Sequence, residues 1–181
     1  MADAVCFGTL AQRSESSRAA IRALLAATRP GALRIFDVNF RPPFVDVTIL
    51  PESLALANVL KLNEGELPML TGIFGIHGSP AEQLAALAGH FDLRVVALTH
   101  GSAGSLIFAD GECSEHPGVR TTVRDTVGAG DAFTAAMTIG LLRGWSLDRI
   151  NQRANEVAAF VCSQAGATPP LPEDLRRCFA E

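Results

Sequence analysis

The sequence is poor in basic residues and contains a single lysine, Lys61, among its 181 residues. Its 15 Lys and Arg residues are outnumbered by 19 Asp and Glu residues, and they form no dense basic run. Because proteins that bind nucleic acid neutralise its phosphates with basic patches, we expect neither DNA nor RNA as a partner. Hydrophobic residues make up 48% of the chain and charged residues only 19%, which indicates a folded protein with a sizeable core.

The sequence also lacks long apolar runs and paired cysteines. No run reaches the roughly 18 residues that span a membrane, and no basic stretch precedes an apolar one at the N-terminus, so we expect neither a membrane segment nor a signal peptide. The four histidines show no zinc-ligand spacing with the cysteines. Buried thiols in the reducing cytoplasm are therefore the expected state of the four cysteines, which are Cys6, Cys113, Cys162 and Cys178.

Apolar segments alternate with amphipathic segments along the whole chain. The periodicity predicts strands over residues 5–10, 33–38, 59–62, 94–99, 105–109 and 119–123. It predicts helices over residues 14–28, 51–58, 79–91, 131–143 and 147–164. Such alternation indicates βαβ units, and hence an α/β fold of three layers in which helices cover both faces of a mostly parallel sheet. We expect one domain over residues 1–181.

Polar residues gather where the predicted strands end. In open α/β sheets, ligands bind beyond the carboxyl ends of the strands. The position of these polar groups is thus the first indication of a binding site. The three groups are Asp37-Val38-Asn39, Asn63-Glu64-Gly65-Glu66 and Thr99-His100-Gly101.

A glycine-rich segment, residues 125–133, lies between a predicted strand and a predicted helix. Gly128 and Gly130 permit close backbone approach, and the free N–H groups of a helix start attract anions such as a triphosphate. A Walker A loop is excluded because no lysine follows, and a dinucleotide fingerprint is excluded because Phe133 stands where a small residue is needed. The alternative is a glycine turn in which Asp131 is a plain helix N-cap.

This segment, D-T-V-G-A-G-D, resembles the C-terminal signature of the ribokinase-like carbohydrate kinases, the PfkB family. The resemblance implies ATP-dependent transfer of the γ-phosphate to a sugar hydroxyl. It also implies an anion hole formed by Gly128, Ala129 and Gly130, with Asp131 as the catalytic base. A carboxylate beside a helix N-terminus stays ionised, so it can accept the hydroxyl proton during attack on phosphorus.

Two further segments match the family in its order. Asn63 and Glu66 match an N-x-x-E element, which implies a role in ordering Mg²⁺ and phosphate through water; the alternative is a solvated helix start. Thr99, Gly101 and Gly104 match a T-x-G-x-x-G loop that contacts nucleotide phosphates; an ordinary turn is the alternative.

The resemblance extends to the cofactor and substrate sides of the site. Asn155 and the loop over residues 166–170 are similar to the family's adenine side, and Asp125 matches a position that helps to hold a monovalent cation such as K⁺. The segment over residues 36–43 looks most like bacterial fructokinases, so Asp37, Asn39 and Arg41 are candidates to bind fructose or a related sugar. A polar network at the strand end is the alternative for these three side chains.

The resemblance covers nearly all of the sequence but only the C-terminal part of the family. Its members carry an N-terminal portion with a Gly-Gly sugar-binding element and a small lid sheet, neither of which has a counterpart here. The leading hypothesis is thus a sugar kinase that is inactive or weakly active as this fragment. The rival is a nucleotide-binding module without kinase activity, which pairs with a missing N-terminal half or forms a homodimer.

Overall fold

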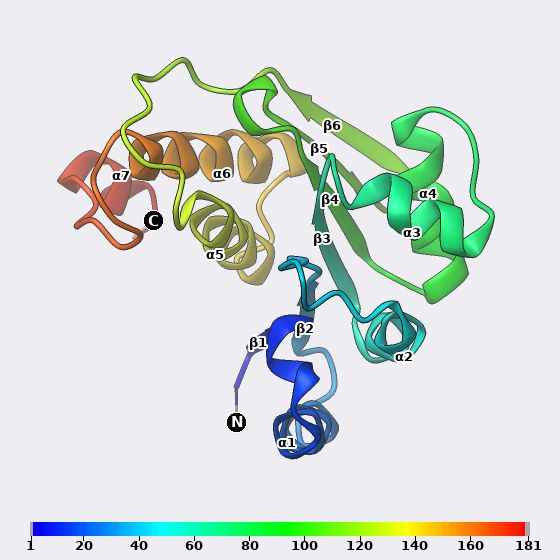
Figure 1. Ribbon diagram of the computed structural model, residues 1–181. Coiled ribbons are helices and arrows are strands. Elements are labelled where there is room, and N and C mark those ends of the chain that lie inside the picture. The colour runs from blue at the N-terminus through cyan, green and yellow to red at the C-terminus, as the bar shows by residue number, and fades with distance from the viewer. Residues whose placement is uncertain (1, 180–181) are drawn as a thin grey trace. The chain divides into compact units, whose positions relative to one another are not determined.

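The computed structural model describes residues 2–179, which divide into two compact units. The first unit comprises the chain through Leu98 together with Phe108–Glu112, and the second comprises Thr99–Ile107 together with the chain from Cys113 onward. A single domain over 1–181 stays a prediction. Within residues 2–179, six strands form one sheet in the order β1-β2-β3-β4-β5-β6 (Figure 1). The strands are β1 (Ala4–Gly8), β2 (Leu33–Asp37), β3 (Val59–Asn63), β4 (Val95–Thr99), β5 (Ser105–Ala109) and β6 (Glu112–His116).

Burial along the strands follows their place in this order. β1 pairs with β2 in parallel, and β2 pairs with β3 in parallel. The first four residues of β3 and of β4 are all buried, whereas β1 and β6, at the two ends of the order, have only one buried residue each. Continuous burial is typical of parallel strands that are covered on both faces. The predicted α/β class with a mostly parallel sheet and flanking helices is confirmed.

Seven α-helices lie among residues 2–179, and the longest two, α5 and α6, lie side by side in the second unit (Figure 1). α4 begins with a reciprocal capping box in which the Ser79 hydroxyl accepts from the Glu82 amide and Glu82 accepts from Ser79. None of the helices of residues 2–179 is long and apolar enough to cross a membrane. The helices are α1 (Glu15–Ala26), α2 (Leu50–Leu56), α3 (Leu67–Phe74), α4 (Pro80–Phe91), α5 (Ala129–Leu142), α6 (Leu147–Cys162) and α7 (Glu173–Cys178), with short 3₁₀ turns at Leu10–Arg13, Val47–Ile49 and Gly101–Ala103.

The predicted strand over residues 119–123 is wrong. Asp110 and Gly111 both have positive φ, of 51° and 84°. Two such residues make the tight turn typical of a two-residue hairpin, after which the next strand starts at once. That strand is β6, at Glu112–His116, and residues 119–123 are irregular and exposed.

Two helices, α3 and α7, were not predicted, and the cysteines differ from the prediction in their burial. α3 and α7 have 8 and 6 residues, too short for a clear helical periodicity. Cys6 and Cys113 are exposed and Cys162 and Cys178 are half-buried, so the expectation of buried thiols is wrong.

Candidate active site

The glycine turn before α5 needs glycine at position 128 for two reasons. Gly128 is the N-cap of α5 and has a φ of 83°, in the left-handed region. A Cβ atom there would lie 2.4 Å from the Ala167 carbonyl oxygen. The turn is thus packed directly against the backbone of the 166–170 loop, and a side chain at this position would have to push the two apart. Gly128 is the N-cap, so the alternative interpretation of Asp131 as a plain N-cap is wrong.

The first turn of α5 presents amide groups that have no carbonyl partner within the helix. Ala129, Gly130 and Asp131 occupy its first three positions. Of these three amides, that of Ala129 alone reaches a backbone carbonyl within the described part of the chain, that of Thr126 at 3.3 Å. These N–H groups and the positive end of the dipole of a 14-residue helix make this turn suited to an anion.

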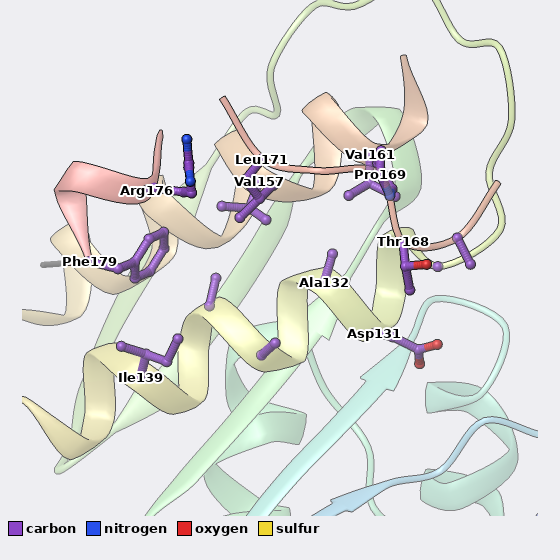
Figure 2. Close-up of a pocket in the computed structure, with 14 residues that line it drawn as sticks. Asp131, Ala132, Ile139, Val157, Val161, Thr168, Pro169, Leu171, Arg176 and Phe179 are labelled. Atoms are coloured by element: carbon purple, nitrogen blue, oxygen red, sulfur yellow. The ribbon is translucent and has the colours of Figure 1, made fainter. Parts of the chain in front are cut away.

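Asp131 is exposed at the start of α5, and no hydrogen bond or ion pair engages its carboxylate within residues 2–179. Its side chain lines a cavity of about 450 Å³. Figure 2 shows Asp131 and Thr168 at one end of this cavity, with Ile139 and Phe179 at the other. The walls between the two ends are apolar and come from α5, α6 and the C-terminal segment. The carboxylate is therefore available to a proton donor.

Asp125 joins the start of the glycine segment to the 166–170 loop. Its Oδ1 accepts from the Val127 amide at 3.0 Å, and its Oδ2 accepts from the Gly166 amide at 3.1 Å. These two hydrogen bonds hold the pKa of Asp125 below its ordinary value, and the bond from Val127 has the larger effect. The carboxylate therefore stays ionised and positions both loops. Its role as a cation ligand stays a prediction.

A second cavity of the second unit, of about 670 Å³, is lined by four of the five residues that were predicted for the nucleotide, and Asn63 is not among its lining residues. Thr99, Gly101 and Gly104 line it together with Gly130 of the glycine turn and Asn155 of α6. The structure thus places the 99–104 loop, the start of α5 and the middle of α6 around one space. Other residues of its wall were not predicted from the sequence. Val119, Thr121 and Val123 were assigned to the erroneous strand over 119–123, and Ala158 and Cys162 belong to the predicted helix over 147–164, whose periodicity carries no sign of a cavity.

Gly104 allows two loops at this second cavity to cross at van der Waals distance. It has a φ of 91°, and a Cβ there would lie 1.9 Å from the His116 carbonyl oxygen. No other residue fits without displacing the backbone that follows β6. The glycine pattern over residues 99–104 is therefore required by the packing as well as suited to phosphate.

In the first unit, the strand-end candidates are engaged by neighbours. Asp37 is buried at the end of β2 and accepts from Lys61 Nζ at 3.1 Å. Asn39 follows with a φ of 43°, and its carbonyl oxygen accepts from Thr9 Oγ1 at 3.3 Å. Arg41 is exposed two residues further on. Of these three predicted substrate residues, Asp37 thus has the chain's only lysine as a buried partner.

Glu66 is buried at the start of α3, and both of its carboxylate oxygens accept backbone hydrogen bonds. Oε1 accepts from the Phe40 amide at 2.9 Å, and Oε2 accepts from the Asn63 amide at 2.8 Å. Asn63 Oδ1 in turn accepts from the amides of Gly65 and Glu66. The N-x-x-E element therefore ties the residues after β2 to the end of β3, and its role toward Mg²⁺ stays a prediction. No cluster of three or more His, Cys, Asp or Glu side chains with metal-binding geometry occurs within residues 2–179.

The model of the pfkB family carbohydrate kinases matches residues 2–174 of the chain. A fructokinase of Klebsiella pneumoniae is 32% identical over 93% of this chain and 58% of its own length, and an Arabidopsis thaliana ribokinase is 30% identical over 91% and 43%. The chain therefore spans about half the length of these curated relatives.

Solved structures agree with this match. A sugar kinase, PH1459, from Pyrococcus horikoshii in complex with ATP superposes with a TM-score of 0.76, at 27% identity over 97% of this chain and 59% of that one. Aminoimidazole riboside kinase from Salmonella enterica, in a complex with aminoimidazole riboside and an ATP analogue, superposes with a TM-score of 0.75, at 25% identity over 98% and 62%.

Proposed function

Because this chain belongs to the pfkB family of carbohydrate kinases, we propose that it transfers the γ-phosphate of ATP to a hydroxyl of a sugar. One observation carries the proposal: the carboxylate of Asp131, which has no partner among residues 2–179, lies on the same helical turn as amides that have no intrahelical carbonyl. A base and an anion site side by side are what attack of a hydroxyl on a phosphoryl group requires.

In the proposed reaction, Asp131 accepts the proton of the sugar hydroxyl as its oxygen bonds to the γ-phosphorus. The bond between that phosphorus and the β,γ-bridging oxygen breaks, and ADP leaves. The amides of Gly128, Ala129 and Gly130 stabilise the negative charge on the transferring group. This donor set is preorganised because Gly128 packs against Ala167 and Asp125 holds the loops on either side.

The nucleotide is assigned to the 670 Å³ cavity. Thr99, Gly101 and Gly104 would contact its phosphates, and Asn155 its base. Asn63 is proposed to contribute to phosphate binding through water. Support comes from the shared cavity wall for four of these residues, and from the Pyrococcus horikoshii relative, whose solved structure is a complex with ATP.

Mg²⁺ and K⁺ are the proposed ions. Glu66 and Asp125 offer the carboxylate oxygens that such cations prefer. Each of these oxygens already accepts one amide hydrogen bond, and a carboxylate oxygen has a second lone pair, so the donor set fits a hydrated ion. Bound Mg²⁺ would neutralise phosphate charge, and Glu66 would orient its waters. Asp125 would help to hold K⁺.

The sugar is proposed to be fructose or a related carbohydrate, bound by Asp37, Asn39 and Arg41. The support is that relatives from Klebsiella pneumoniae and Escherichia coli, at 32% and 30% identity, are fructokinases. The cytoplasm, where sugars and ATP meet, is the proposed location.

The alternative is a nucleotide-binding module without independent kinase activity. It is favoured by the length of the relatives, of which this chain spans 58% or less in the two curated examples above. It is also favoured by the apolar cavity along α5 beside Asp131, a surface that further polypeptide, from a missing half or from a second copy, would bury.

A coupled assay of ADP release with a sugar panel that includes fructose separates these functions. The kinase proposal predicts release that depends on a sugar and is lost in Asp131→Asn. Stabilisation of the protein by Mg²⁺-ATP without sugar-dependent release would favour the binding module. Failure of ATP to shift the melting temperature of the folded chain would contradict both.

A further inference from the structure

Helix α5 is apolar on its exposed face as well as on its buried face. Among the 14 residues of Ala129–Leu142, no residue other than Asp131 is charged. Ala135, Ile139 and Leu142 form an exposed stripe at spacings of four and three residues, with Ile139 37% and Leu142 47% exposed. A helix that is apolar all round is normally covered on every side, so this stripe indicates a surface that another polypeptide covers.

The stripe continues into the 450 Å³ cavity, because Ala135 and Ile139 also line that cavity. We call the stripe and the cavity together the α5 groove. Figure 2 shows Asp131 at one end of the α5 groove and Arg176 at the other end, beside Phe179. Asp131 and Arg176 are both exposed, and neither side chain has an ion pair within residues 2–179. The groove is thus apolar along its length and carries opposite unpaired charges at its two ends.

A groove with an acid at one end and a base at the other is complementary to a second copy of itself. When a two-fold axis relates two such grooves, the two α5 helices run antiparallel, and each end of one groove meets the opposite end of the other. Asp131 of each copy then meets Arg176 of the other copy, twice per dimer. The helix dipoles also agree with this direction, since the positive N-terminus of each α5 lies beside the negative C-terminus of the other.

The sizes of the side chains along α5 fit the same arrangement. Antiparallel pairing centred at the level of Met137 sets Ala135 opposite Ile139 of the other copy, and Ala132 opposite Leu142, in both directions. Each contact then joins a small side chain to a large one. Because the distance between packed helices depends on the side chains at the contact, this alternation lets the two helices approach closely and leaves few voids.

We propose that the α5 groove is an interface between two copies of this chain, related by a two-fold axis. The apolar stripe supplies most of the affinity. The two Asp131–Arg176 pairs fix the antiparallel direction, since a parallel arrangement would set Asp131 against Asp131. The pairing occupies the carboxylate that has no partner in the single chain, and it does not depend on the function proposed for that carboxylate.

Sedimentation velocity of the 181-residue chain from about 1 μM to about 200 μM tests the proposal, and we expect the fraction of dimer to rise over this range. Ile139→Glu should leave only monomer, because the interface would bury a charge without a partner. Met69→Glu is the matched control, since Met69 of α3 is 40% exposed and lies outside the α5 groove; this variant should dimerise like the wild type. Leu142→Glu repeats the test at a more exposed position should Ile139→Glu fail to fold by circular dichroism.

A charge exchange tests the direction of the pairing. Arg176→Glu and Asp131→Arg should each raise the dissociation constant of the dimer about tenfold or more, because two attractive pairs become repulsive, and the double variant should restore it. Arg177→Glu is the control for net charge, since Arg177 pairs with Glu173 of its own helix and should leave the constant unchanged.

Each outcome bears on one part of the proposal. A wild-type chain that stays monomeric over the whole range overturns the interface between copies and leaves the groove to a different polypeptide. A dimer that persists in both folded α5 variants, Ile139→Glu and Leu142→Glu, overturns its placement on α5. Failure of the double exchange to restore the affinity lost in the single variants overturns the pairing of Asp131 with Arg176.

Discussion

The acidic side chains of the two units differ in what they contact. In the first unit, Asp37 and Glu66 are buried, and their carboxylates accept from Lys61 and from two backbone amides. In the second unit, Asp131 is exposed on the first turn of α5 and nothing in residues 2–179 engages its carboxylate. All three came from motifs that sequence analysis marked as functional.

This difference shows which carboxylate is suited to chemistry. A general base needs an oxygen that can accept a proton from a substrate, and a buried carboxylate that accepts hydrogen bonds from its own protein is held in place by them. Asp131 therefore has the properties of a base, whereas Asp37 and Glu66 have those of residues that position the loops after β2 and β3. Four substitutions or conditions test this contrast.

Loss of the lysine beside Asp37 should have the largest effect. Lys61→Met leaves the Asp37 carboxylate buried without its cationic partner, which typically costs about 3–5 kcal/mol of unfolding free energy. Urea denaturation measures this loss. Arg22→Met is the control, since Arg22 and Glu52 form a pair with side chains that are 45% and 50% exposed, and its loss should cost less than about 1 kcal/mol. Equal losses in the two variants would contradict a structural role for the buried pair.

Asp131→Asn should lower sugar-dependent turnover by about 10² or more, equivalent to about 2.7 kcal/mol of activation free energy. Unfolding free energy should hardly change, because the Asp131 carboxylate has no partner within residues 2–179 to lose. Affinity for ATP should stay the same or rise slightly, since a negative charge near phosphate is removed. Steady-state kinetics, calorimetry and melting temperature check the three parts. A folded Asn variant with near-normal turnover would refute the assignment of Asp131 as the base.

Glu66→Gln, unlike Asp131→Asn, should lower the unfolding free energy, though by less than Lys61→Met does. The new Nε2 group would face a backbone amide of Phe40 or Asn63, donor against donor, at a cost of about 1–3 kcal/mol in unfolding free energy. Urea denaturation of this variant beside Asp131→Asn is the measurement. If Glu66→Gln kept full stability, the two hydrogen bonds would not be what holds the 63–66 turn.

Asp125 should make the smallest contribution to the unfolding free energy, and this contribution should depend on pH. Its pKa is lowered in the folded chain by the Val127 and Gly166 amides. A lowered pKa means stability that is present above the unfolded-state pKa and is lost as pH falls through the folded-state pKa. Unfolding free energy measured from neutral pH down to about pH 3 should thus fall less steeply in Asp125→Asn than in the wild type. Parallel pH profiles would contradict the contribution.

Local sequence patterns predicted most of the helices and strands. They did not predict the short helices or the strand that starts directly after a tight turn. The strands that became β2, β3 and β4 were recognisable as apolar runs, and α4 by its Ser79 and Glu82 capping box. β6 was misplaced because the two-residue turn at Asp110 starts it directly, while Val119 and Val123, apolar by type, line a cavity instead. α3 was missed because eight residues give too little periodicity.

The sequence alone determined the α/β class, the position of the glycine turn and the acidic residue that follows it, because each depends on local periodicity or on backbone conformations that only glycine adopts readily. Only the tertiary structure decided which carboxylates are free. Whether Asp37 meets Lys61, or Glu66 meets the Phe40 amide, depends on contacts between residues 24 and 26 positions apart. In the same way, the buried Asn155 Nδ2 donates to Ser105 Oγ, 50 positions earlier in the chain. Hydrogen bonds across such separations leave no pattern in a single sequence, since they form only where folding brings the two groups together.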